Sequence, residues 1–152
     1  MKENLSEYNA YDPGTWSKAY FDKNSGGYVV INNQRVEHSN SSKNEKAKFD
    51  KELLMTKIFA QNGHKIEMLE EIPRIASPDI RIDGILGELK RVSGHNNIVK
   101  DAKKAVRKQR AEIVLFEFDT MTHFIQSELA KLKKLGMNVK YFITGSNKVI
   151  DL

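Results

Sequence analysis

Three side chains that could act together on a metal ion or a phosphate group lie close in the sequence: Asp79, Glu88 and Lys90. Between them, Asp83-Gly84 is a two-residue turn signal flanked by alternating apolar residues. A type I′ turn there pairs Asp79 with Glu88 across a β-hairpin, and the strand period of two places Lys90 on the same face. Opposed residues have Cβ atoms roughly 5 Å apart. Two carboxylates that close repel each other unless a divalent metal ion or a shared proton stabilises them.

The register of this hairpin decides which aspartate belongs to the pair. In the register above, Asp83 is the first turn residue and supports only the turn. A shifted register would bring Asp83 to Glu88 in place of Asp79, because a slip by one residue moves every side chain to the other face.

A basic segment follows the hairpin. Eight Lys or Arg and one acidic residue lie between Lys90 and Arg110, in a chain whose net charge is +5. A basic stretch beside carboxylates indicates a polyanionic partner, most often nucleic acid, although a solvated face of Lys and Arg gives the same pattern. The candidates for substrate contacts are Arg91, His95, Lys100, Lys104 and Arg107.

Two helices that flank the hairpin each carry a polar residue on their apolar side. Residues 98–110 form an amphipathic pattern in which Gln109 lies in the middle of the apolar arc. A buried amide must be hydrogen-bonded, so Gln109 either bonds the sheet backbone or reaches the site. Residues 45–62 predict a helix that ends at Gly63, and Glu52 lies within its buried stripe. Glu52 either reaches water at the edge of that stripe or belongs to a site.

The rest of the chain predicts a mixed α/β sheet. Residues 1–25 indicate irregular structure with a short helix around residues 16–21, and residues 35–38 indicate a strand that pairs with residues 27–32. The remaining patterns predict strands at 27–32, 64–69, 112–118, 138–143 and 149–152, and a helix at 120–135. From residue 45 the order is helix, strand, hairpin, helix, strand, then a further helix and strand. We expect an N-terminal extension over residues 1–43, with short strands packed on a domain of residues 44–152.

Composition excludes several classes of protein. The chain has 152 residues and no cysteine, so disulfides and thiolate metal sites are absent. No apolar run approaches the ~20 residues that a membrane-spanning helix needs. The length and the 39% hydrophobic content predict one globular domain with a substantial core.

The order αβββαβ, with Pro78-Asp79 on one arm of the hairpin and Glu88-Leu89-Lys90 on the other, resembles the PD-(D/E)XK nuclease superfamily, which has a restriction-endonuclease-like core. The resemblance covers roughly residues 45–118. Within the superfamily, the segments PDIRIDG and GELKR and the basic helix before a hydrophobic strand are similar to CdiA C-terminal toxin nucleases, which are delivered domains of contact-dependent growth inhibition systems.

The resemblance implies a function. It implies a toxin endonuclease that cleaves RNA, often tRNA, acts in the bacterial cytoplasm after delivery as part of a larger secreted protein, and is inhibited by an immunity protein. It also implies a site carboxylate on the first helix, which matches Glu52, and makes Gln109 a candidate for substrate binding. Asp79, Glu88 and Glu52 would hold a divalent metal ion, with Mg²⁺ favoured over Mn²⁺ and Zn²⁺. Lys90 would orient or deprotonate the attacking water, or stabilise the phosphate.

Three alternatives remain open from the sequence. A DNA-cleaving enzyme of the same fold would have the same site. A metal-independent RNase toxin would use Lys90, His95 and carboxylates as acid and base. A non-catalytic nucleic-acid-binding module would have no reason to keep Asp79, Glu88 and Lys90 together.

Overall fold

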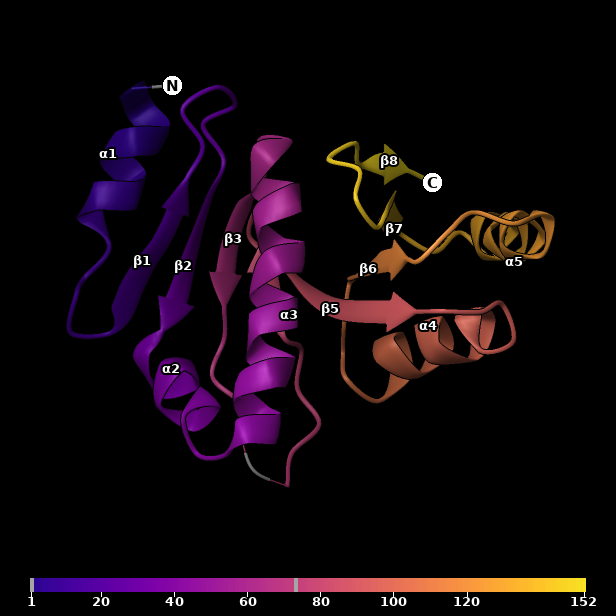
Figure 1. The fold of residues 1–152 in the computed structure, drawn as a ribbon, viewed down its shortest axis with the longest axis horizontal. Helices are drawn as coiled ribbons and strands as arrows, with labels where there is room; N and C mark the ends of the chain where they lie inside the picture. The colour runs from indigo at the N-terminus through magenta and orange to yellow at the C-terminus, as the bar shows by residue number, and fades with distance from the viewer. Residues whose placement is uncertain (1, 73) are drawn as a thin grey trace.

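The computed structural model describes residues 2–72 and 74–152, which contain one mixed sheet of eight strands and five helices (Figure 1). In chain order the elements are α1 (Lys2–Ala10), β1 (Trp16–Phe21), β2 (Tyr28–Asn32), α2 (Asn33–Ser39), α3 (Lys43–Gln61), β3 (Lys65–Met68), β4 (Ile80–Ile82), β5 (Ile85–Val92), α4 (Ile98–Arg107), β6 (Ile113–Phe118), α5 (His123–Lys134), β7 (Val139–Ile143) and β8 (Ile150–Asp151). The predicted order of helices and strands from residue 45 onward is confirmed.

The strands lie in the sheet in the order in which they follow each other along the chain. The pairs β2–β3, β5–β6 and β6–β7 are parallel, and the other neighbouring pairs are antiparallel. Each parallel pair is joined by helical segments, as parallel strands require a crossover connection. These segments are α2 with α3, then α4, then α5.

Helices cover both faces of the sheet. Leu115 on β6 belongs to a core cluster with residues of α3, whereas its neighbours Val114 and Phe116 pack in a second cluster with α4 and α5. Successive strand residues point to opposite faces, so α3 lies on one face of β6 and α4 and α5 lie on the other. In Figure 1, α3 crosses in front of the sheet, and α4 and α5 lie at the right.

Among the described residues, no helix is long and apolar enough to cross a membrane.

The hairpin of β4 and β5 has the predicted register. Ile80 pairs with Gly87 and Ile82 with Ile85, and the two turn residues Asp83 and Gly84 have φ angles of 50° and 88°. Two positive φ angles are the mark of a type I′ turn, which suits the right-handed twist of the strands. Asp83 is therefore a turn residue, and Asp79 lies at the open end of the hairpin beside Glu88.

The prediction for the N-terminal region was wrong in three places. Residues 2–10 form helix α1, and residues 16–21 form strand β1, which pairs antiparallel with β2. The backbone hydrogen bonds between residues 16–21 and β2 stabilise a strand, although the sequence of residues 16–21 has a weak helical pattern. The expected strand at residues 35–38 is part of α2, because the side chain of Asn32 accepts a hydrogen bond from the Gln34 amide and caps a helix.

Helix α4 is shorter than predicted. It ends at Arg107 with Lys108 as C-cap, and Arg110 has a φ angle of 60°. The Ala111 amide donates to the Ala105 carbonyl, so the chain turns back toward β6 directly after the helix. Gln109 therefore lies in the connection between α4 and β6.

The division into an extension of residues 1–43 and a domain of residues 44–152 stays a prediction. Strands β1 and β2 belong to the same sheet as the later strands.

Candidate active site

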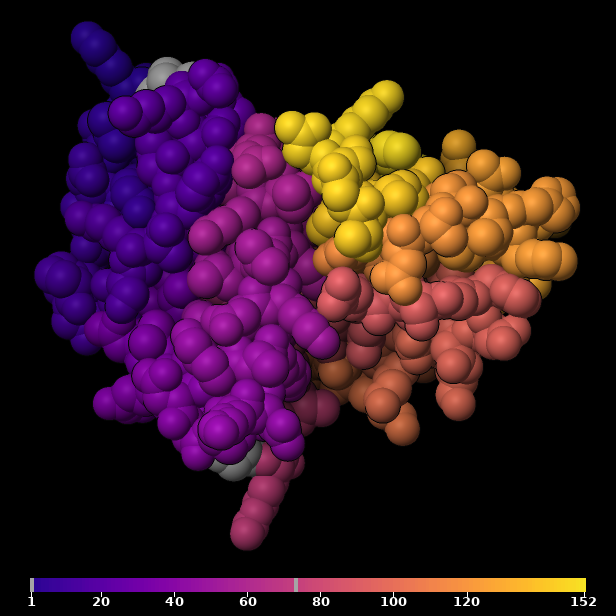
Figure 2. Space-filling view, viewed as in Figure 1, coloured from indigo at the N-terminus to yellow at the C-terminus, as the bar shows by residue number. Residues whose placement is uncertain are grey.

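A cavity of about 450 Å³ lies where α3 faces the open end of the hairpin. In Figure 2 the surface is recessed between the magenta atoms of α3 and the salmon atoms of β5 and α4. The lining residues are Asn44, Ala47, Lys48, Lys51, Glu52, Met55, Asp79, Glu88, Leu89, Lys90, Arg91 and Gln109. The cavity therefore brings together the four predicted catalytic residues, Asp79, Glu88, Lys90 and Glu52, with two of the predicted substrate contacts.

Asp79 and Glu88 are joined by reciprocal contacts across the hairpin. The Asp79 amide donates to Glu88 Oε1 at 3.2 Å, and the Leu89 amide donates to Asp79 Oδ2 at 3.0 Å. Glu88 is only 2% exposed. Burial raises the pKa of Glu88 to about 9, and the hydrogen bond with Asp79 and the negative charge of Asp79 contribute to this rise. The pair thus carries one proton in the absence of a cation, as expected for two carboxyl groups in one site.

Lys90 forms an ion pair with Glu88. Its Nζ lies 4.0 Å from Glu88 Oε2, and its positive charge partly opposes the rise in the pKa of Glu88. Lys90 follows Glu88 by two positions on β5, so both side chains leave the strand on the same face.

Glu52 reaches the cavity from α3 and is largely buried. Its Oε1 forms an ion pair of 3.0 Å with Arg35, which is 2% exposed. Burial raises the pKa of Glu52, and the negative charge of Asp79 raises it further, whereas Arg35 and Lys48 oppose this. Glu52 therefore lines the candidate site and is not an edge residue that reaches water.

Arg35 contacts two residues of the candidate site, and its position there was not predicted from the sequence. Besides pairing with Glu52, its guanidinium donates to the carbonyl oxygens of Leu69 at 2.8 Å and of Asp79 at 3.4 Å. It therefore fixes the backbone on which the Asp79 side chain is carried. The sequence contained one indication of this position: Asn32 is a suitable N-cap, and a helix that begins after it would carry Arg35.

Two lysines of α3 supply positive charge that the sequence analysis did not single out. Lys48 and Lys51 line the cavity beside Glu52. Burial lowers the pKa of Lys48, but the carboxylates of Glu71 and Glu52 outweigh this and raise it. Lys48 precedes Glu52 by four residues, and that spacing places both on one face of a helix, which was the signal available in the sequence.

Gln109 also lines the cavity, although it lies outside the helix that was predicted to hold it. In the described part of the chain, its Oε1 is the one buried side-chain polar atom that has no hydrogen-bond partner. A buried polar atom without a partner is costly, and such atoms often face a ligand or an ion.

The other predicted substrate contacts lie farther away. Lys100, Lys104 and Arg107 are exposed on α4 and do not line the cavity, and His95 stacks on Phe124 with ring centroids 4.8 Å apart. Arg91 does line the cavity, and its Nε lies 3.5 Å from Glu117 Oε2.

The residues fit a hard divalent cation by their chemistry. Asp79 and Glu88 offer carboxylate oxygens, and Glu52 keeps Oε2 free of Arg35. The burial that raises the pKa of Glu88 would be offset by a bound cation, because a positive charge favours the ionised carboxylate. Among the described residues, however, Asp79, Glu88 and Glu52 do not bring three ligand atoms within 4.8 Å of one another. Glu52 is therefore better placed to act through a water molecule.

Comparison with known proteins found one family model that matches part of the chain. Residues 76–149 match the family model of the contact-dependent growth inhibition CdiA C-terminal domain. A search of solved structures found similarity to a CdiA-CT/CdiI toxin and immunity complex from Burkholderia pseudomallei, with 14% identity and a TM-score of 0.56 over 74% of this chain and 89% of that chain. At this identity the likeness concerns the fold. No curated protein matches the chain significantly.

The segment similar to the CdiA C-terminal domain carries most of the candidate site. It includes Asp79, Glu88, Lys90 and Gln109, whereas Glu52 and Arg35 lie before it. The structural similarity covers 74% of this chain, which is more than the family match covers. Assignment to the PD-(D/E)XK superfamily stays a prediction.

Proposed function

We propose that this chain is a toxin domain of contact-dependent growth inhibition that hydrolyses phosphodiester bonds in RNA, with tRNA favoured as substrate. The observation that carries the proposal is the buried Asp79–Glu88 pair with Lys90 beside it, in a cavity lined by further cations. The match of residues 76–149 to the CdiA C-terminal domain supports the toxin assignment.

The side chains of the cavity suit phosphodiester hydrolysis with a divalent metal ion, Mg²⁺ being favoured. When bound, such an ion neutralises phosphate charge and acidifies a water molecule. Asp79 and Glu88 would hold it, and Glu52 would contact its water shell through Oε2. Lys90 would orient the attacking water or stabilise negative charge on the phosphate. Arg35 positions Asp79 by holding its carbonyl oxygen.

The positive side chains divide into two groups by their distance from the carboxylates. Lys48, Lys51 and Arg91 line the cavity and would contact the phosphates next to the cleaved bond. Lys100, Lys104 and Arg107 would contact the backbone farther along the substrate. Neutralising these three residues should weaken binding and reduce its dependence on salt, because fewer counterions would be released.

Incubation of the purified chain with total RNA, isolated tRNA and plasmid DNA tests the proposal. Each substrate is supplied with Mg²⁺ or with EDTA, and the Glu88→Gln variant serves as the inactive control. Cleavage of RNA with Mg²⁺ alone supports the proposal. Cleavage of DNA alone would assign a DNase of the same site, and undiminished cleavage of RNA in EDTA would assign a metal-independent RNase. Binding of nucleic acid without cleavage under any condition would assign a binding module.

The proposal includes a cognate immunity protein. The similar solved structure is a toxin and immunity complex, and the positive residues around this cavity would favour an acidic partner. The gene next to that of the toxin is the candidate, and its product should abolish cleavage when it is mixed with the toxin in equal amounts.

A further inference from the structure

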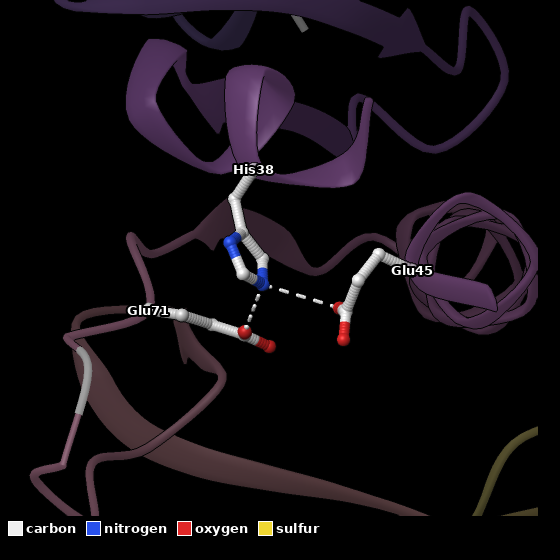
Figure 3. A group of neighbouring side chains, drawn as sticks. All are labelled: His38, Glu45 and Glu71. Carbon is white, nitrogen blue, oxygen red and sulfur yellow. Dashed lines mark ion pairs between the residues drawn. The ribbon is translucent and has the colours of Figure 1, made fainter. Parts of the chain in front are cut away.

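A histidine and two glutamates from three separate segments meet near the N-terminal end of α3 (Figure 3). His38 belongs to α2, Glu45 to the first turn of α3, and Glu71 to the segment after β3. His38 Nε2 lies 3.1 Å from Glu45 Oε2 and 3.0 Å from Glu71 Oε2. In the described residues this is the one group of His, Asp or Glu whose three ligand atoms lie within 4.8 Å of one another.

The arrangement leaves one nitrogen between two carboxylates. A single Nε2–H can point along a linear hydrogen bond to only one of the two oxygens, and the other oxygen then receives a weak contact. A cation located between the three atoms would bind all of them at once. One imidazole nitrogen and two carboxylate oxygens, with water in the fourth position, are a ligand set that suits Zn²⁺.

We propose that His38, Glu45 and Glu71 form a Zn²⁺ site separate from the Asp79–Glu88 cavity. Ligands about 2.0–2.1 Å from a tetrahedral ion are separated by roughly 3.3 Å. The two N–O distances here would have to increase by only a few tenths of an ångström. Each of the three side chains is partly open to solvent, so an ion can enter.

The surrounding charges are compatible with this site. Glu71 uses its other oxygen, Oε1, to face Lys48 at 3.4 Å and Arg35 at 3.8 Å. These two cations would reduce the affinity for Zn²⁺, but they leave Oε2 directed at His38. Because Arg35 also pairs with Glu52, part of its charge is already balanced.

The ion would join the segment that carries Asp79 to two helices. Glu71 lies in the segment between β3 and β4, whose carbonyl oxygens at Leu69 and Asp79 accept hydrogen bonds from Arg35. A cavity of about 350 Å³ is lined by His38 and Glu71 and also by Asp79 and Gln109, so this site adjoins the first one. The expected effect of Zn²⁺ is stabilisation of this segment, and it does not depend on the proposed nuclease activity.

Thermal unfolding of the Glu88→Gln variant with and without Zn²⁺ tests the inference, since this variant weakens the carboxylate pair as a competing Zn²⁺ site. At a Zn²⁺ concentration 100 times Kd, Tm should rise by about 5–10 °C. Adding His38→Ala or Glu71→Gln should abolish the rise, whereas His123→Ala, which removes an exposed histidine on α5, should preserve it. Mg²⁺ in place of Zn²⁺ should give no rise through these residues, because imidazole is a poor ligand for it.

Calorimetric titration of Zn²⁺ into the same variants provides a second readout. One equivalent bound to Glu88→Gln, and none after addition of Glu45→Gln, would support the site. The inference is overturned if Zn²⁺ does not raise Tm, or if the rise persists after His38→Ala. It is also overturned if wild type shows the rise and Glu88→Gln does not, because the ion then binds in the cavity. Should His38→Ala fail to fold, the Glu45→Gln variant decides the question.

Discussion

Each end of the β4–β5 hairpin carries an aspartate, and the two aspartates differ in the groups that surround them. At the turn, Asp83 lies 2.6 Å from His64 Nδ1 and accepts from the Lys65 amide at 2.8 Å. Burial raises the pKa of Asp83, but these hydrogen bonds outweigh it and hold the pKa below its usual value. At the open end, Asp79 faces Glu88, whose pKa is raised. Hydrogen bonds thus favour the ionised form of Asp83, whereas burial and Asp79 disfavour the ionised form of Glu88. Carboxyl groups with strongly shifted pKa values in a cleft are candidates for a functional site.

The largest expected effect concerns the open end. Asp79→Asn and Glu88→Gln should each reduce RNA cleavage by at least about 100-fold, because a bound metal ion supplies several kcal/mol of charge stabilisation. Initial rates of tRNA cleavage with Mg²⁺ provide the measurement. Asp83→Asn is the matched control at the turn end and should keep near wild-type activity. Equal losses from Asp79→Asn and Asp83→Asn would remove the distinction between the two ends.

The second effect concerns the cations that accompany each end. Lys48→Ala should lower kcat/KM by about tenfold through loss of one charge-assisted phosphate contact. Lys65 starts the strand beside the turn and forms an ion pair of 2.7 Å with Glu7. Lys65→Ala should change kcat/KM less than twofold, since exposed ion pairs contribute little. A loss for Lys65→Ala as large as that for Lys48→Ala would mean that the substrate also covers the turn.

The third effect is a dependence of stability on pH. Glu88 has a pKa near 9 in the fold against an ordinary value of 4.5, so between these values the folded chain holds a proton that the unfolded chain has released. Stability should therefore fall as pH rises through this window, by up to about 1.4 kcal/mol per pH unit. Urea unfolding in EDTA at pH 7 and pH 8 measures it.

The variants at the two ends should respond differently in that experiment. Glu88→Gln should remove most of the fall, because its amide does not titrate. Asp83→Asn should leave the fall unchanged, since the pKa of Asp83 lies below its usual value and outside the window. An identical slope for wild type and Glu88→Gln would contradict the raised pKa of Glu88.

The smallest effect concerns the stability of the turn. Asp83→Ala removes the bonds to His64 and Lys65 at a position with a φ angle of 50°, and it should cost about 1–2 kcal/mol. Asp83→Asn should cost less, because asparagine tolerates positive φ. Urea unfolding at pH 7 gives both values, and a larger cost for Asn than for Ala would contradict the turn assignment.

Local patterns explain why the hairpin could be predicted. The Asp-Gly turn and the strand period favoured one register over a shifted one, and the observed pairs of Ile80 with Gly87 and Ile82 with Ile85 confirm that register. The end of α3 before Gly63 was predictable for the same reason, because Gly63 has a φ angle of 91°. The αβββαβ order followed from the apolar periodicity of each element.

Contacts between distant segments could not be predicted in this way. Arg35 meets Glu52 and the Asp79 carbonyl only after α2 folds against α3, and no periodicity links these positions. Strand β1 was missed because its pairing with β2, and not its own composition, determines its conformation. The sequence identified Gln109 as a polar residue within the apolar arc of a predicted helix. Because α4 ends at Arg107, Gln109 lies after the helix and not within it.

The reach of Arg35 has a consequence for how this domain could be exchanged between proteins. A graft that kept residues 44–152 and replaced everything before them would retain all the carboxylates of the cavity but lose Arg35. Glu52 would then keep a buried charge without its partner, a loss that typically costs 3–5 kcal/mol. The Asp79 carbonyl would also lose a donor. A junction that preserves the site must therefore lie before α2, because that helix carries Arg35.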